Sequence, residues 1–375
     1  MIFEKNYDCS MDKMIRTRLL FDQNLKGYKV DLFGDVFNSN QILDTIRVLS
    51  FVVKKKYCNI SLLLNFLCSF IADKLVYVIL EDLCYCFVNS CSCRLFVKFP
   101  NLKFSILADG IRFSALNKLP DKTSFNKAYR KDIYKRHYRN IFSKIETDDT
   151  GLSILNQDVR CFLANNGLSQ HYSDKLSEVI SEIVGNACEH GKSDCLLDVD
   201  VTDEYVREED GKGSYYGVNV AVVNYSEYLF HSPLMTKIEK CPKLNGRYTY
   251  VYDARINHGK FWKKGGYDEE FFFMISSFQH KISGSQEKPI DVGGTGLTTL
   301  IQSLEDYSYG SECYLLSGKM CLKFLSQYLQ YDQNRLIGFN RNNDYINDKP
   351  DDSIIGNCKV FFPGSAFNLH FVIEK

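Results

Sequence analysis

The sequence has no excess of charge of either sign and no long uninterrupted apolar run. Lysine plus arginine and aspartate plus glutamate number 46 each, so no overall field draws the chain to nucleic acid or to a membrane. The most apolar stretch, 60–88, contains four charged residues that the centre of a membrane span would not tolerate: Asp73, Lys74, Glu81 and Asp82. No secretory signal precedes the 14 cysteines, so we expect reduced thiols in a cytoplasmic protein without a membrane partner.

Common catalytic signatures are also missing. The 7 histidines show no HExxH pairing, and neither G-x-S-x-G nor the Walker-type G-x-x-x-x-G-K-[ST] occurs. Metalloprotease, serine hydrolase and P-loop hypotheses therefore have no support. Four clustered cysteines lack the usual zinc spacing and are expected to be buried small hydrophobes: Cys84, Cys86, Cys91 and Cys93.

The composition that remains describes a globular α/β protein of two domains. Of 375 residues 45% are hydrophobic and 25% charged, which is ordinary for folded domains. The first domain, residues 1–121, alternates strands with helices and predicts a parallel or mixed sheet. The expected strands are 28–33, 59–64 and 94–99, and the expected helices are 40–54 and 73–88. This layout resembles the STAS domains of anti-sigma factor antagonists, but the turn at 68–73 lacks aspartate-serine-glycine, so Ser69 is not expected to be phosphorylated.

Residues 122–150 form a basic segment between the domains. Its cations are Lys127, Arg130, Lys131, Lys135, Arg136 and Arg139, and its aromatics are Tyr129, Tyr134, Tyr138 and Phe142. A basic, aromatic surface of this kind is one way to bind nucleic acid. The interpretation we favour is an amphipathic connecting helix over 122–145 with inward aromatics and solvated cations, because the chain is neutral and no recognition motif accompanies the run. A polar break at 146–151 then marks the start of the second domain, 151–375.

The second domain contains the most informative segment, a helix ending at 191. Its expected buried face is Leu176, Val179, Ile180, Ile183, Val184 and Ala187. Ser173 is the expected N-cap and Gly191 the C-cap. Glu182 and Asn186 lie one turn apart on the other face. A phosphate-handling site uses such a pair, because the carboxylate can orient or deprotonate a nucleophile and the carboxamide oxygen can bind magnesium.

Other elements of this domain predict a helix layer on a largely antiparallel sheet. The expected strands are 195–201, 216–224, 312–324 and 367–373, and the polar stretch 334–357 is expected to be a surface loop. A glycine cluster, Gly293-Gly294-Thr295-Gly296-Leu297, opens onto a further helix. Each motif alone has an ordinary explanation: Glu182 and Asn186 would be a solvated helix face, and the glycine cluster a plain loop.

Together these motifs resemble the GHKL ATPases of the Bergerat fold, which include gyrase B, MutL-type repair proteins, histidine kinases and anti-sigma serine kinases. The run Glu182-Ile183-Val184-Gly185-Asn186-Ala187-Cys188-Glu189-His190-Gly191 resembles their first signature, and its ending is closest to the anti-sigma serine kinases. The glycine cluster resembles the box that closes over the nucleotide phosphates. Leu315-Leu316-Ser317-Gly318 and Phe362-Pro363-Gly364-Ser365 resemble the strand and turn that finish the domain.

The resemblance implies ATP and magnesium as ligands. Asn186 would bind the metal, and Glu182 would orient water or a protein hydroxyl for attack on the γ-phosphate. A mobile lid would span 272–288, from which Lys281 would reach phosphate. Backbone N–H groups at the glycines would approach the phosphates, with the following helix presenting its positive end. The nucleotide-binding set would be Asn186, His190, Asn224, Lys281, Gly293, Gly294, Thr295, Gly296 and Leu297.

One departure concerns adenine recognition. Members of the family end a strand with aspartate-x-glycine-x-glycine, and the aspartate accepts a hydrogen bond from the adenine amino group. Here Asn224 stands in the aspartate position and Ser226 in that of the first glycine. An asparagine oxygen still accepts this bond but without charge assistance.

Three hypotheses follow for an α+β protein whose Bergerat-type domain is preceded by a small α/β domain. The first is a slow ATPase or a serine protein kinase in a bacterial regulatory or defence pathway, with a protein partner. The alternative is a non-catalytic nucleotide sensor or interaction scaffold. A third is a nucleic-acid-dependent ATPase that uses the basic segment. Dimerisation is open, since no heptad-bearing helix is evident.

Overall fold

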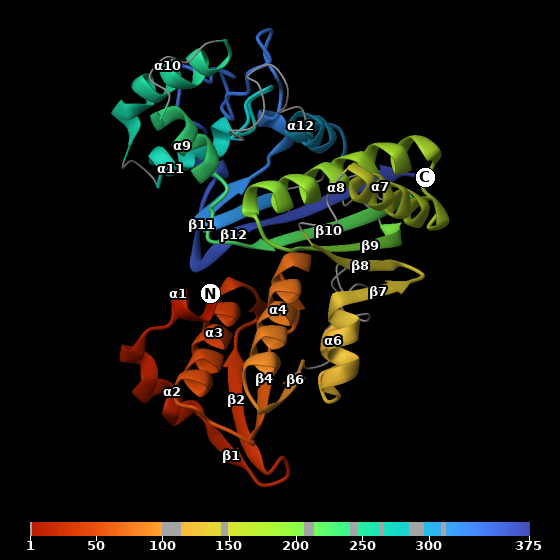
Figure 1. The fold of residues 1–375 in the computed structure, drawn as a ribbon, viewed down its shortest axis with the longest axis vertical. Helices are drawn as coiled ribbons and strands as arrows, with labels where there is room; N and C mark the ends of the chain where they lie inside the picture. The colour runs from red at the N-terminus through yellow and green to blue at the C-terminus, as the bar shows by residue number, and fades with distance from the viewer. Residues whose placement is uncertain are drawn as a thin grey trace. The chain divides into compact units, whose positions relative to one another are not determined.

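The computed structural model describes residues 2–99, 114–143, 149–205, 214–240, 246–262, 266–284, 296–308 and 313–375 (Figure 1). Gly293, Gly294 and Thr295, which were predicted to bind nucleotide, lie outside these ranges. Contacts divide the chain into two units, which are described separately. The first unit is Met1–Asn140 with Asp198–Thr202 and Lys359–Phe361, and the second is Ile141–Leu197 with Asp203–Cys358 and Phe362–Lys375.

The first unit contains a four-stranded mixed sheet in the order β1-β2-β4-β6. The strands are β1 (Leu20–Asp22), β2 (Gly27–Phe33), β4 (Ser61–Leu67) and β6 (Arg94–Lys98). β2, β4 and β6 run parallel to their neighbours, and β1 pairs antiparallel with β2. A short parallel pair joins β3 (Val36–Phe37) to β5 (Phe70–Ile71). The predicted alternation of strands and helices, and the predicted mixed sheet, are confirmed.

The two main helices of this unit begin at side-chain caps. At α3 (Ser39–Lys54), Asn38 Oδ1 accepts from the Asn40 N–H at 2.9 Å, and Gln41 Oε1 accepts from the Asn38 N–H at 3.0 Å. At α4 (Lys74–Ser90), Asp73 Oδ1 accepts from the Val76 N–H at 3.0 Å. Each cap satisfies backbone donors that a helix leaves unpaired at its start. The shorter elements before α3 are α1 (Ile2–Asn6), η1 (Cys9–Met11) and α2 (Asp12–Arg18).

The clustered cysteines near α4 are only partly buried. Cys84 and Cys93 are buried, as expected, but Cys86 is exposed and Cys91 is half-buried. Within the described ranges no group of three or more histidine, cysteine, aspartate or glutamate side chains is placed to hold a metal ion.

The prediction of one amphipathic helix over 122–145 is wrong. The chain forms η3 (Ala115–Lys118) and α6 (Lys122–Arg130), and then a hairpin of β7 (Lys131–Tyr134) and β8 (His137–Phe142). The expectation of solvated cations also fails at Arg139, which is 1% exposed. Tyr129, Tyr138 and Phe142 are buried as expected, but Tyr134 is exposed.

Arg139 belongs to a buried ionic cluster within the first unit. Its guanidinium pairs with Glu81 from α4 and, through Nε at 2.5 Å, with Asp198 from β9 (Cys195–Tyr205). The Lys74 ammonium pairs with Asp198 and Asp200. So many ionised groups can stay buried only because groups of opposite charge pair with one another.

His137 completes this cluster. Its Nε2 lies 3.0 Å from Asp198 Oδ2, and its Nδ1 lies 3.6 Å from Asp132 Oδ2. Burial lowers the pKa of His137, but the two carboxylates outweigh burial and raise it to about 9. The imidazole is therefore protonated at neutral pH. Burial opposes ionisation of Asp198, yet Lys74, then Arg139 and His137, hold the pKa of this carboxyl well below its usual range.

The second sheet is six-stranded, in the order β11-β12-β10-β9-β8-β7. Its long strands are β9, β10 (Tyr215–Tyr225), β11 (Tyr314–Lys323) and β12 (Ile355–Glu374). β12 pairs antiparallel with both β10 and β11, and the register places Asn224 opposite Ser365. The α+β class and the predicted strands are confirmed. The expected turn at Phe362–Ser365 is wrong: these residues lie inside β12, where Gly364 has φ +97°.

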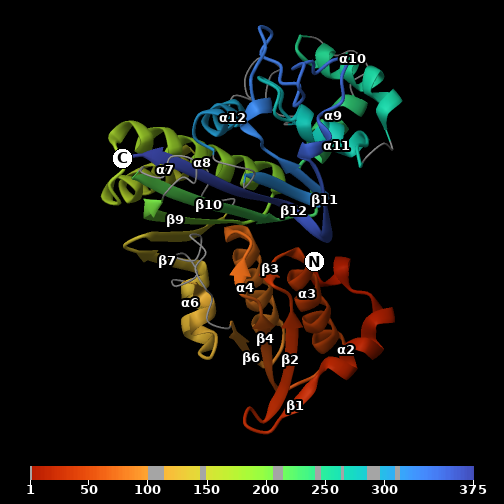
Figure 2. The same ribbon diagram turned by 180° about the vertical axis from the view of Figure 1, so that it is seen from behind.

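Two helices cover one face of this sheet, α7 (Asp149–Asn165) and α8 (Gln170–Gly191) (Figures 1 and 2). All six positions of the predicted buried face of α8 are buried. The prediction of Ser173 as N-cap is wrong, because α8 begins at Gln170 and Ser173 is buried inside the helix. The helix ends at Gly191, and Lys192 takes the left-handed conformation with φ 53°. α12 (Gly296–Tyr307) packs against α8.

A group of shorter helices follows β10: α9 (Ser232–Lys240), α10 (Tyr248–His258), η5 (Gly259–Phe261) and α11 (Glu269–Ser276) (Figure 2). The prediction of a surface loop over 334–357 is confirmed only in part, because residues 334–351 form no regular helix or strand but do not all lie at the surface. Leu336, Ile337, Phe339 and Tyr345 are buried, and the segment contains η7 (Asp352–Ile354) and the start of β12; η6 (Ser326–Tyr328) precedes it. In the described part of the chain, no helix is long and apolar enough to cross a membrane.

Candidate functional site

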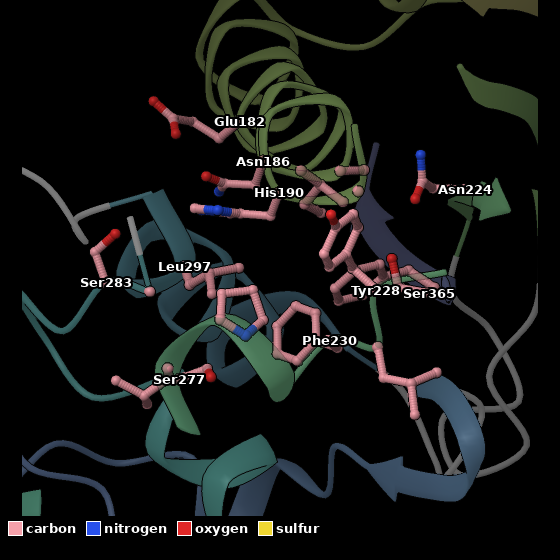
Figure 3. A pocket seen from close by; sticks show the side chains of 18 of the residues that line it. Glu182, Asn186, His190, Asn224, Tyr228, Phe230, Ser277, Ser283, Leu297 and Ser365 are labelled. Carbon is pink, nitrogen blue, oxygen red and sulfur yellow. The ribbon is translucent and has the colours of Figure 1, made fainter. Parts of the chain in front are cut away.

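A cavity of about 210 Å³ opens in the second unit beside α8 (Figure 3). Its walls come from segments far apart in the sequence: the second half of α8, the end of β10 and the residues after it, the loop after α11, the first turn of α12, and β12. Concave sites of mixed polarity are where small-molecule ligands bind. The lining residues that the sequence predicted as catalytic or nucleotide-binding are Glu182, Asn186, His190, Asn224 and Leu297.

One stripe of α8 supplies the polar wall. Glu182, Asn186 and His190 follow one another at four-residue spacing and project to the same side of the helix (Figure 3). Glu182 is exposed, whereas Asn186 and His190 are half-buried. The opposite stripe of α8 is packed into the core, so the helix cannot rotate these groups away without exposing apolar surface. The predicted pair of carboxylate and carboxamide therefore faces a common space.

Asn224, at the end of β10, is held in one orientation. It is 1% exposed, and its Nδ2 donates to Ser193 O at 3.2 Å, Ser193 Oγ at 2.9 Å and Asp194 O at 3.0 Å. Three acceptors around this position identify it as Nδ2, so the other amide atom is Oδ1. The oxygen lies on the side of Tyr228 and Ser365, and the nitrogen on the opposite side (Figure 3). Asn224 thus presents an acceptor rather than a donor.

Gly191 makes room for this asparagine. A Cβ at position 191 would lie 2.1 Å from Asn224 Oδ1 and 2.7 Å from its Cγ. Ser226 donates from Oγ to Gly191 O and accepts from the Tyr228 N–H at 3.0 Å. The serine therefore ties the end of α8 to the chain after β10. The missing side chain of Gly191 leaves room for the Asn224 amide. The sequence predicted Gly191 only as a helix cap, so this role was missed.

An apolar wall lies across from α8. Tyr228, Phe230, Pro233 and Leu234 contribute to it, and Tyr228 is 46% exposed. The Lys192 ammonium lies 5.1 Å from the centre of the Tyr228 ring. None of these residues was predicted. The one sequence signal for these four residues was that they follow Asn224 closely along the chain.

The third side of the cavity carries small polar groups and the start of α12. Ser277, Ser283 and Gly284 line it together with Leu297. Lys281, the expected phosphate contact, is exposed in this loop with φ 60°, and it is not among the residues that line the cavity.

The expected lid over 272–288 is wrong in its first part. Phe272–Ser276 belongs to α11, and all five side chains are buried. Burial lowers the pKa of His231 to about 4, and burial followed by the charges of Arg335, Arg247 and Lys281 lowers the pKa of His280.

Comparisons with known proteins add no family. No family model matches this chain, and no curated protein or solved structure matches it either. Interpretation of the site therefore rests on its own chemistry. A carboxylate, a carboxamide and an imidazole face a fixed amide oxygen and an exposed aromatic ring across one cavity.

Proposed function

We propose that the second unit binds ATP with magnesium in this cavity, in the manner of a GHKL-type protein. The observation that carries the proposal is the convergence of Glu182, Asn186 and Asn224 on one space from two separate elements. The buried face of α8 is made by other side chains, among them Ile183 and Ala187. A nucleotide uses all three polar groups.

The residues fit a magnesium ion that arrives with its nucleotide. Magnesium prefers oxygen ligands, retains water and is usually held by few protein groups plus substrate phosphates. Asn186 Oδ1 and the nearby Glu182 carboxylate are such groups, and the described residues offer no closed metal cluster. The ion would neutralise phosphate charge. Free magnesium alone is therefore expected to leave the stability of the protein unchanged.

The fixed orientation of Asn224 favours binding of a nucleotide base that carries an exocyclic amino group. Its oxygen accepts a hydrogen bond, and the three acceptors around its nitrogen prevent the amide from turning to donate. Adenine offers a donor at that position, whereas guanine offers a carbonyl oxygen that would repel the asparagine oxygen. The neutral residue therefore retains the direction of the family's hydrogen bond and loses only its charge assistance.

Glu182 distinguishes turnover from binding alone. As a carboxylate one turn from Asn186, it can orient water or a partner's serine hydroxyl for attack, which gives a slow ATPase or a protein kinase. The second candidate is a nucleotide sensor without turnover. It is favoured by the neutral Asn224 and by Ser226, which bonds the protein's own backbone. Glu182→Gln should abolish phosphate release or transfer while ATP binding persists; unchanged release would remove Glu182 from the chemistry.

Thermal unfolding tests the proposal directly. The only tryptophan, Trp262, lies in the second unit, so its fluorescence reports the unit that contains the cavity. A ligand at about 100 times its Kd stabilises by about 2.7 kcal/mol. We expect Mg-ATP to raise Tm in wild type and Glu178→Ala but not in Asn186→Ala, because Glu178 is exposed on α8 one turn outside the cavity. Absence of any shift in wild type, or an equal shift by GTP, would contradict the proposed site.

A further inference from the structure

The end of α6, the start of β7 and the turn of the following hairpin are basic. Four cationic side chains occur within nine residues and all are exposed: Lys127, Arg130, Lys131 and Lys135. α6 and β7 contact each other and lie together in both ribbon views (Figures 1 and 2). These four side chains are called the hairpin cation surface below.

The charges of this surface are uncompensated. None of the four makes an ion pair with an acidic residue in the parts of the chain that the structure describes. The acidic residue between them, Asp132, is 3.6 Å from His137 and 4.0 Å from Lys118. In a chain of zero net charge, four adjacent unpaired cations produce a local positive field that the overall balance conceals.

The end of α6 does not account for all four of these charges. Lys127 and Arg130 lie in the last turn of α6, where cations interact favourably with the helix dipole. Lys131 is the C-cap residue of α6, where its backbone N–H donates to Lys127 O, whereas Lys135 lies in the hairpin turn and stabilises no helix end. Exposed positive charges without an acidic partner favour binding of an anion from outside the protein.

Exposed apolar side chains lie between these two lysines. Ile133 is 56% exposed and Tyr134 is 59% exposed. β7 is also the last strand in its sheet, so no further strand of the described chain covers its outer edge. Cations alternating with an exposed aromatic ring are how proteins hold single-stranded nucleic acid, because the cations contact phosphates and the ring stacks on a base.

We propose that the hairpin cation surface binds single-stranded nucleic acid. At about 3.3 Å per residue, Lys131 and Lys135 are separated by about 13 Å along the backbone, so the two lysines can contact different phosphates of one strand. The cations bind the phosphates and Tyr134 stacks on a base. Two exposed apolar side chains are too few to anchor a protein in a lipid surface, which favours the nucleic acid over an anionic membrane. The proposal is independent of the nucleotide cavity.

Fluorescence anisotropy with a labelled oligothymidylate and an oligouridylate of equal length tests the proposal on the full chain. The test variant replaces all four cations by glutamine. The control variant removes one arginine and three lysines elsewhere in the first unit, all exposed: Lys13, Arg16, Lys26 and Lys98. Both variants have the same net charge, so only the position of the lost charge differs. Circular dichroism confirms that each variant is folded.

We expect wild type and the control variant to bind at low salt and the test variant to bind at least about tenfold more weakly. The slope of log K against log salt should decrease in magnitude by about 2.8, which is about 0.7 for each of four phosphate contacts. Tyr134→Ala should weaken binding about fivefold or more and Tyr134→Phe should not, as stacking requires. A preference for RNA or DNA would identify the source. No binding by wild type, equal loss in both variants, or binding only to phosphatidylserine vesicles would overturn the proposal.

Discussion

The buried guanidinium of Arg139 makes the strongest stability prediction for the first unit. Arg139→Met removes the partner of Glu81 and one of the partners of Asp198, both of which are at most 1% exposed in their side chains. Removing one member of a buried ion pair costs about 3 to 5 kcal/mol, because the remaining charge stays buried without its partner. Asp198 keeps Lys74 and His137, so we expect the lower end, about 3 kcal/mol.

A surface pair in the same unit provides the control. Arg18 lies 3.2 Å from Asp44, with about a quarter of its side chain exposed. Exposed pairs contribute about 0 to 1 kcal/mol, so Arg18→Met should cost less than about 1 kcal/mol. Arg139→Lys should fall between the two arginine-to-methionine variants, because lysine keeps the charge but not the two-pronged geometry.

Hydrogen exchange measured by mass spectrometry on peptides from α4 is the appropriate assay. The single tryptophan lies in the second unit, so fluorescence would not report unfolding of the first. We expect Arg139→Met to lower the protection of slowly exchanging α4 amides by roughly 100-fold, which corresponds to about 3 kcal/mol. Equal protection in Arg139→Met and Arg18→Met would show that Arg139 is not held by buried carboxylates, and the reasoning would be refuted.

Two further predictions concern other parts of the chain. The pKa of His137 is raised above its unfolded value of about 6.5 to about 9, so its stabilisation is complete below about pH 6.5 and is lost as pH rises through about 9. The loss is about 3 kcal/mol, and His137→Gln should flatten the pH dependence of α4 exchange; an unchanged profile would exclude the pairing with Asp198. Gly191→Ala should displace Asn224 and abolish the Tm rise with Mg-ATP, whereas Gly185→Ala, whose Cβ meets only Leu152 methyls at 3.2 Å, should retain it. Retention of that rise in Gly191→Ala would contradict the close approach.

Periodic patterns predicted most of the fold because they report burial, which local sequence determines. The buried stripe of α8 and the strands of the first sheet are of this kind. The prediction of one helix over 122–145 failed because the aromatic residues fit a helical period and a hairpin equally well. The burial of Arg139 was also missed, because nothing in the local sequence shows that it pairs with Glu81 from α4. The prediction that 334–357 lies at the surface failed because it rested on composition. The segment has many polar residues, but a few apolar ones, among them Ile337 and Phe339, reach the core.

The site shows the same division between local chemistry and distant partners. Glu182 and Asn186 were predictable because their spacing alone places them on one side of a helix. The behaviour of Asn224 was not, because the groups that fix its amide, Ser193 and Asp194, come from another segment. From sequence alone, replacing a carboxylate with an amide reads as lost recognition. With the amide nitrogen fully occupied, the oxygen can only accept. Under the proposed nucleotide function, Asn224 therefore lacks the charge of an aspartate but keeps the direction of the hydrogen bond that would select adenine.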